Sequence, residues 1–82
     1  MTEEKIRQQL RDWIVVRARD KPDDLSDNTP LLEKGILTSL DIVELILFIE
    51  KLRGGVEVAS EDLEPVAFRD VDSIYRSFFA TL

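Results

Sequence analysis

The stretch EKGILTSLDIVELILFIEKL, residues 33–52, starts as a loop and continues as a helix with more apolar residues than one buried face requires. Thr38 can cap this helix, and Asp41 three residues later gives an arrangement close to a capping box. The helix is expected to begin at Thr38 or Ser39 and to stop at the two glycines after Arg53, a basic residue that suits the negative end of a helix. A serine in this place is most often only a cap. Because Thr38 can take that role, we expect the hydroxyl of Ser39 to be exposed.

The apolar side chains of this helix fall into two clusters when they are counted at about 100° per residue from Ser39. One cluster covers roughly 220° to 340° and is typical of a buried helix face. Its members are Ile42, Leu45, Ile46, Ile49 and Leu52. The other cluster covers roughly 40° to 100°, next to Ser39. We call its three residues, Leu40, Val43 and Leu47, the apolar strip.

The apolar strip has acidic neighbours, with Glu50 on one edge and Glu44 beside Lys51 on the other. A central helix that is buried on two sides would explain the strip without a functional role. An apolar strip with an acidic rim is also how a surface for docking a partner protein is built. We favour the docking surface, because the strip begins beside Ser39.

The composition limits the chemistry that this chain can perform. Its 82 residues suffice for one domain, residues 1–82, with a modest core. The sequence has no cysteine and no histidine, which excludes disulfides, thiolate metal sites and the usual general base for a serine nucleophile. A hydrolase that uses Ser39 would need Lys34 or Lys51 as its base, which leaves this class close to excluded. We therefore expect neither an enzyme nor a protein-held metal.

The charge is acidic and unevenly distributed. The formal net charge is −6; residues 1–40 carry 8 acidic and 7 basic residues, and residues 41–82 carry 9 and 4. Such a chain lacks the clustered positive surface that binds nucleic-acid phosphates. The acidic second half either only solvates the surface or docks basic partners.

The sequence contains no targeting or membrane signal that we recognise. The N-terminus is charged and lacks the apolar run of a signal peptide. The longest apolar run, LILFI, is too short to span a bilayer. We therefore expect a cytoplasmic protein without membrane insertion.

The flanking sequence predicts a first and a last helix. The first covers about residues 3–18 and is capped by Thr2. The last starts at Asp70, with Phe68 placed to staple it. Residues at helical spacing mark one face of each helix: Ile6, Leu10, Trp13, Ile14 and Arg17 in the first, and Val71, Ile74, Tyr75, Phe78 and Leu82 in the last.

Two connecting segments complete the prediction. VEVASEDLEP, residues 56–65, predicts a short extended piece and about one turn of helix capped by Ser60. Residues 20–39 contain prolines, Asp, Asn and Gly, which indicates a long connection. Its apolar residues are expected to hold it on the core: Leu25, Leu31, Leu32, Ile36 and Leu37. The fold class is all-α.

With these elements in place, GILTSLDIVELILFIEKL resembles the attachment motif of acyl carrier proteins and of the related peptidyl and D-alanyl carrier proteins. In that family a serine followed by Leu or Met opens the second helix, and the serine maps onto Ser39. The resemblance covers most of the chain, including TPLLEKGI in the loop, VEVASEDLEP as the short third helix and FRDVDSIYRSF as the start of the fourth. It implies a four-helix bundle with three main helices, one short third helix and a long loop between the first two.

The resemblance implies that Ser39 carries a 4′-phosphopantetheine arm. In the family this arm is donated from coenzyme A by a separate Mg-dependent phosphopantetheinyl transferase, and its terminal thiol holds the cargo as a thioester. The family usually has Asp immediately before the serine, where this chain has Thr38. That aspartate is associated with the transferase and its metal, so Thr38 leaves open which transferase acts.

We therefore expect a monomeric, stand-alone carrier that meets an acyl- or aminoacyl-activating ligase and acyl-processing enzymes. The expected partner surface is the apolar strip together with nearby acidic residues, namely Asp41, Glu44, Glu50, Glu57, Glu61 and Asp62. Acyl cargo and aminoacyl or D-alanyl cargo both remain open. Phe48, near roughly 180° on the helix, is predicted to narrow any cleft between the second and third helices, which would favour short or polar cargo. An unmodified adaptor that binds one protein through the same strip is the alternative from another class.

Overall fold

The computed structural model describes residues 2–18 and 25–80, which form three α-helices and two short 3₁₀ turns. Helix α1 spans Glu3–Arg17, α2 spans Ser39–Leu52 and α3 spans Val71–Phe78. The 3₁₀ turns η1 and η2 span Ser60–Asp62 and Pro65–Phe68. The described residues contain no β-strand, so the all-α prediction is confirmed.

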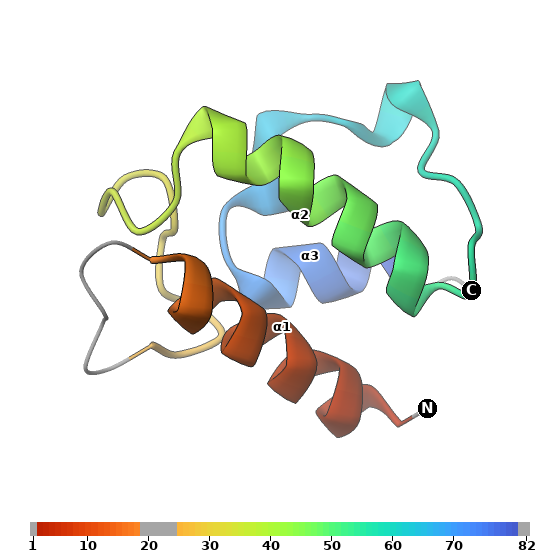
Figure 1. Ribbon diagram of the computed structural model, residues 1–82, viewed down its shortest axis with the longest axis horizontal. Coiled ribbons are helices and arrows are strands. Elements are labelled where there is room, and N and C mark those ends of the chain that lie inside the picture. Colours follow the sequence, from red (N-terminus) through yellow and green to blue (C-terminus); the bar gives the residue numbers. More distant parts are fainter. Residues whose placement is uncertain (1, 19–24, 81–82) are drawn as a thin grey trace.

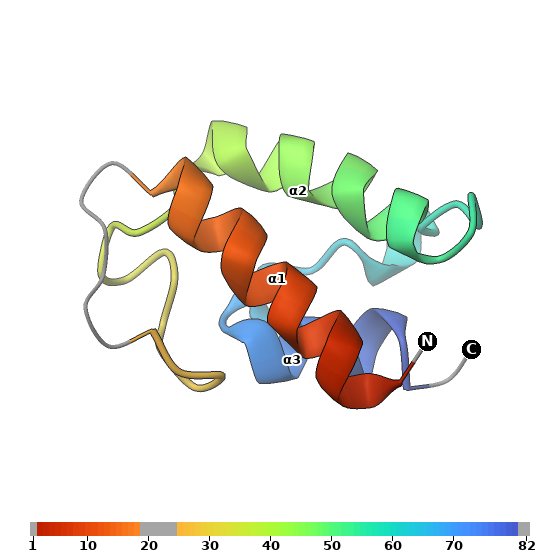
Figure 2. The same ribbon diagram turned by 60° about the horizontal axis from the view of Figure 1, so that its bottom comes forward.

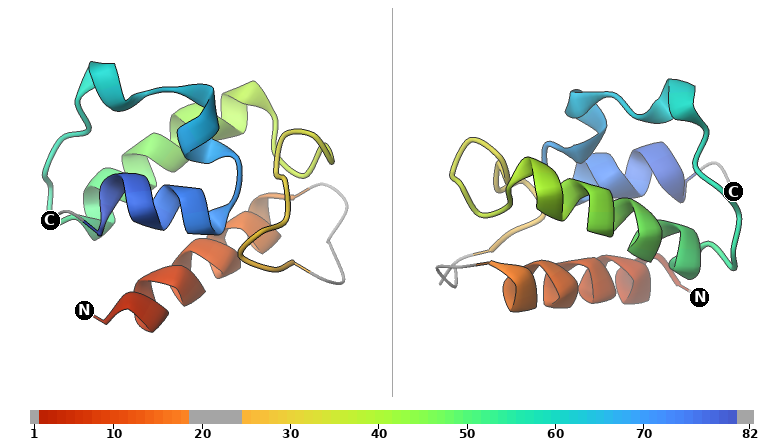
Figure 3. Two further views of the ribbon diagram at one scale, coloured as in Figure 1. Left: turned by 180° about the vertical axis from the view of Figure 1, so that it is seen from behind. Right: turned by 45° about the horizontal axis from the view of Figure 1, so that its top comes forward.

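The three helices, whose arrangement Figure 1 shows, contribute to one cluster of buried apolar side chains. Figure 2 shows α1 in front of α3, and these two helices pack against each other. Helix α2 lies between α1 and the segment that carries η1 and η2 (Figure 3, right). Fully or almost fully buried side chains come from all three helices and from the loop before α2: Leu10, Ile14, Leu31, Leu37, Leu45, Ile49, Ile74 and Phe78.

The predicted helix caps are confirmed for the three α-helices. The Thr2 hydroxyl accepts a hydrogen bond from the Lys5 amide at 3.3 Å, which starts α1. The Asp70 carboxylate accepts one from the Ser73 amide at 2.7 Å, which starts α3. Phe68 is buried just before this cap, with its ring centroid 5.3 Å from that of Phe78. Leu82, expected on the same face, lies outside the described residues.

The segment after α2 differs from its prediction. Ser60 was expected to cap one helical turn, but it is the first residue of η1, and Ala59 occupies the cap position without a side-chain hydrogen bond. The segment forms two 3₁₀ turns instead of one α-helical turn because Pro65 forces the residue before it out of the helical region. Glu64 accordingly has an extended backbone, with φ −92° and ψ 144°.

The long connection is fixed to the core mainly through Leu31. Its side chain is fully buried, its amide donates to the Arg69 carbonyl at 2.8 Å, and its carbonyl accepts from the amide of Ile36 at 2.9 Å. Ile36 and Leu37 are buried as predicted, and Leu25 packs against the core. Leu32 does not join them, because its side chain lies at the surface, 40% exposed.

A network of ion pairs joins α1, the loop and α3. Arg7 donates to Asp27 at 2.8 Å and to Asp72 at 3.0 Å, and Arg11 donates to Asp27 at 2.5 Å. Burial raises the pKa of Asp27, but the hydrogen bonds from Arg11 and Arg7 outweigh burial and hold that pKa below its usual range. Asp27 therefore stays ionised and ties the loop to two helices.

None of the described helices is long and apolar enough to cross a bilayer.

Candidate functional site

The start of α2 is built so that Thr38, and not Ser39, caps the helix. The Thr38 hydroxyl accepts from the Asp41 amide at 3.3 Å, and the Asp41 carboxylate accepts from the Thr38 amide at 2.9 Å. This reciprocal pair is a complete capping box, as the sequence predicted. Ser39 is the first helical residue and is exposed, and its hydroxyl makes no hydrogen bond with any other described residue.

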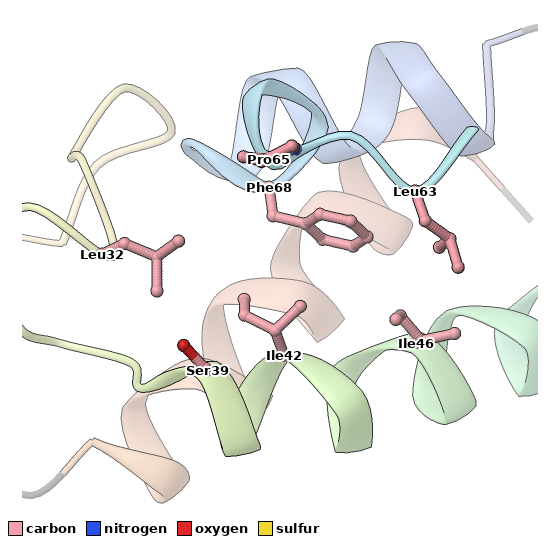
Figure 4. Close-up of a pocket in the computed structure, with 7 residues that line it drawn as sticks. All are labelled: Leu32, Ser39, Ile42, Ile46, Leu63, Pro65 and Phe68. Carbon is pink, nitrogen blue, oxygen red and sulfur yellow. The ribbon is translucent and has the colours of Figure 1, made fainter. Parts of the chain in front are cut away.

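Ser39 stands beside an apolar pocket of about 210 Å³ between α2 and the segment that carries η1 and η2 (Figure 4). Ile42 and Ile46 form the α2 side, and Phe68 faces them from η2. Leu32 closes the end near Ser39, and Leu63 closes the far end. Pro65 completes the lining, in which Ser39 is the one polar residue among the described residues. We call this cavity the α2 pocket.

Phe48 does not enter the α2 pocket, so the prediction that it narrows the cleft is wrong. Its ring stacks on Trp13 of α1, with ring centroids 5.6 Å apart and an interplanar angle of 20°. The angular count correctly separated Phe48 from the other apolar clusters of α2. It did not reveal that this direction faces α1, because a count along one helix does not locate its neighbours. Phe48 therefore gives no reason to expect short or polar cargo.

The apolar strip is exposed to solvent. Leu40, Val43 and Leu47 are 73%, 56% and 64% exposed, whereas Leu45 and Ile49 on the opposite face are fully buried. The alternative of a helix buried on two sides is therefore wrong. Three exposed apolar side chains in a row on one helix are typical of a surface that a partner covers.

The acidic residues on α2 are largely occupied by bonds within the chain. Asp41 belongs to the capping box, and Glu44 forms an ion pair with Arg17 of α1. The Glu50 carboxylate accepts a hydrogen bond from the Val58 amide at 2.9 Å, which holds the segment after α2 against the helix. These residues were predicted to meet partners, and the structure gives each of them a structural contact that the sequence pattern did not indicate.

The acidic residues of the following segment are differently placed. Glu57, Glu61 and Asp62 are all exposed, and no ion pair within the described residues involves them. Glu61 and Asp62 lie in η1, and Glu57 lies in the segment that joins α2 to η1. Their negative charge is therefore available to a partner. Whether a partner uses it stays a prediction.

Sequence reasoning missed the far wall of the α2 pocket. It assigned Leu32 to the core, gave Phe68 only a stapling role, and assigned no role to Leu63 or Pro65. The one available signal was Pro65, which ends a helical turn and so separates η1 from η2. Pro65 also lines the α2 pocket, across from Ile42 (Figure 4).

In comparisons with known proteins, no family model matches the chain and no curated protein is significantly similar to it.

Proposed function

We propose that this chain is a stand-alone carrier protein of the acyl-carrier type, with a 4′-phosphopantetheine arm on Ser39 and an acyl group as its cargo. In this proposal η1 and η2 stand where that family has its short third helix. The single observation that carries the proposal is that Ser39 is exposed at the mouth of an apolar pocket and does not cap the helix. The resemblance of GILTSLDIVELILFIEKL to the family's attachment motif supports the same assignment.

The residues at the start of α2 fit a phosphodiester on Ser39. The hydroxyl is accessible to a transferase, since it is exposed and makes no hydrogen bond with other described residues. Free backbone N–H groups and the positive end of the helix dipole favour an anion at this end of a 14-residue helix. Once attached, the arm would supply a terminal thiol on which cargo is held as a thioester.

The lining of the α2 pocket favours acyl over aminoacyl cargo. Apart from Ser39 at its mouth, its walls are the side chains of Ile42, Ile46 and Phe68 with those of two leucines and a proline, and none of these six can accept a hydrogen bond from an ammonium group. Burying such a group without a partner costs several kcal/mol, whereas each buried methylene contributes about 0.8 kcal/mol. An aliphatic chain is therefore the cargo that this pocket stabilises.

Partner recognition in this proposal combines the apolar strip with the free acidic residues near η1. Leu40, Val43 and Leu47 would contact apolar surface on the transferase, the activating ligase and the acyl-processing enzymes. Glu57, Glu61 and Asp62 would steer basic partners toward that contact. Asp41, Glu44 and Glu50 would contribute less than the sequence suggested, because each is already bonded within the chain.

The experiment is an intact-mass measurement after incubation with coenzyme A, Mg²⁺ and a phosphopantetheinyl transferase of broad specificity. The expected result is a mass gain of one phosphopantetheine in the wild type and none in Ser39→Ala. Thr38→Asp, which restores the family's usual residue, should be modified faster than the wild type. A wild type that gains no mass while Thr38→Asp does would show that this chain is not a substrate as it stands, and a gain that persists in Ser39→Ala would exclude Ser39.

A second candidate, an unmodified adaptor with the same fold, is favoured by one observation. Thr38 replaces the aspartate that the family usually places before the serine, and it is fully engaged in the capping box. An adaptor would keep its function in Ser39→Ala and lose it in Leu47→Glu, which puts a charge on the apolar strip. A carrier would lose its function in Ser39→Ala.

A further inference from the structure

The α2 pocket extends along α2, and two apolar side chains meet at the end that lies away from Ser39 (Figure 4). Leu32 stands at the Ser39 end. At the other end the Leu63 side chain points from the end of η1 toward Ile46 of α2. A chain that is attached to Ser39 and runs along the pocket therefore meets Leu63 last.

The next turn of α2 does not continue the apolar wall. Glu50 follows Ile46 by one helical turn, so both side chains lie on the same side of α2. The Glu50 carboxylate accepts a hydrogen bond from the Val58 amide at 2.9 Å and offers no apolar surface. The wall that an aliphatic chain can use on α2 thus ends at Ile46, opposite Leu63.

The Leu63 side chain is not part of the core. It is 39% exposed, and the cluster of buried apolar side chains does not include it. Its backbone is held independently of its side chain, because its amide donates to the Ser60 carbonyl at 3.2 Å and Pro65 fixes the start of η2. Truncation of Leu63 to alanine should therefore leave the turn in place and free the space of the lost carbon atoms at this end of the pocket.

We propose that Leu63 is a specificity-determining residue that sets the length of the aliphatic chain held by the α2 pocket. This inference rests on the proposed function for its biological meaning. Ile46 lies seven residues after Ser39, which is about 10 Å along the helix axis. An extended alkyl chain advances about 1.3 Å per bond, so the chain meets Leu63 after roughly eight atoms. The cargo class is therefore an acyl group of medium length.

The test does not require a transferase, because the chain has no cysteine and Ser39→Cys provides a single thiol at the mouth of the α2 pocket. The reagents are alkyl methanethiosulfonates of roughly 2 to 12 carbons, a range that brackets roughly eight chain atoms. The introduced thiolate attacks the alkyl-bearing sulfur, forms a disulfide with it and releases methanesulfinate. The readout is the Tm of each adduct, relative to the adduct with a methyl group.

For Ser39→Cys alone, Tm should rise with chain length by up to about 3 °C for each methylene that becomes buried. The rise should stop near six carbons, because the disulfide sulfurs take up part of the roughly eight atoms that reach Leu63. In Leu63→Ala on this background the rise should continue for about two more carbons, which occupy the freed space. Leu63→Ile keeps the number of carbon atoms and should keep the original limit.

Leu32→Ala is the matched control. Leu32 lines the same pocket, is 40% exposed and would lose the same atoms as Leu63, but it stands at the end where the chain enters. Its truncation should reduce the rise in Tm without moving the chain length at which the rise stops.

Four results would overturn the inference. These are a Tm that does not depend on chain length, an unchanged limit in Leu63→Ala, an equal extension in Leu63→Ile, and an equal extension in Leu32→Ala. They leave the modification of Ser39 untouched, because the intact-mass experiment tests that separately. Conversely, a wild type that no transferase modifies would overturn the proposed function and leave the alkyl series unaffected.

Discussion

The two sides of this molecule are held together in different ways. On the side of α1 and α3, Arg7 and Arg11 reach Asp27 and Asp72 with donor–acceptor distances of 2.5 to 3.0 Å, and the Arg7 guanidinium also lies over the Tyr75 ring, 4.7 Å from its centre. On the side of α2 and the 3₁₀ turns, an apolar pocket of about 210 Å³ remains, with Ser39 at its mouth.

The difference separates the part that stabilises the fold from the part that is available for function. Charged groups that are partly buried and mutually bonded lose much when one partner is removed. Apolar side chains that line a cavity have no van der Waals contacts on the side of the empty space. A ligand that fills the cavity therefore makes favourable contacts with them. We therefore expect changes on the α1–α3 side to affect mainly stability, and changes on the α2 side to affect mainly modification and cargo.

The largest expected effect on stability is that of Arg7→Leu. The Arg7 side chain is only 14% exposed, and its loss leaves Asp72 without its least exposed partner and Asp27 with Arg11 alone. We expect a loss of about 2–3 kcal/mol in the free energy of unfolding, measured by urea denaturation. Arg76→Leu is the matched control, since Arg76 also pairs with Asp72 but is 75% exposed; it should cost about 0.5 kcal/mol or less. Equal losses in the two variants would contradict the contrast.

The same network predicts how stability depends on pH. Because the pKa of Asp27 is lower in the folded state, its contribution is fully present above its unfolded pKa of about 3.9 and is lost as the pH falls through the lower folded value. The urea midpoint of Asp27→Asn should therefore lie below that of the wild type at pH 7, and the difference should be smaller at pH 3, below the unfolded pKa. A difference that is the same at both pH values would show that Asp27 acts through packing and not through its charge.

At the start of α2 we predict a smaller difference in stability, between variants of two adjacent residues. Thr38→Ala removes one half of the capping box and should cost about 1 kcal/mol in the free energy of unfolding. Ser39→Ala removes an exposed hydroxyl that takes no part in capping and should change stability by less than about 0.5 kcal/mol. A larger loss in Ser39→Ala than in Thr38→Ala would mean that the serine is a structural cap, which would weaken its assignment as an attachment site.

Local sequence signals predicted the helices and the start of α2 well. Thr2, Thr38 and Asp70 all cap where they were expected to, because capping depends on residues only three positions apart. The angular count likewise separated the exposed strip at Leu40 and Leu47 from the buried face.

Features that depend on where another element lies could not be predicted. The count along α2 did not show that Phe48 meets Trp13, that Glu44 meets Arg17, or that Glu50 bonds the Val58 amide. The α2 pocket depends on the path of the segment after Gly55, which brings Leu63 and Phe68 opposite Ile42. Such distant pairings leave no periodic signal in a single sequence.

The central claim is that Ser39 tethers an acyl group that the α2 pocket can hold, and one comparison tests it most directly. Octanoyl-CoA and alanyl-CoA are used as donors for a transferase of broad specificity, the products are confirmed by intact mass, and the Tm of each loaded protein is compared with that of the protein carrying the bare arm. We predict modification of Ser39 with both donors and a Tm raised by several degrees for the octanoyl form alone. A chain that is not modified, or two loaded forms with the same Tm, would contradict the account.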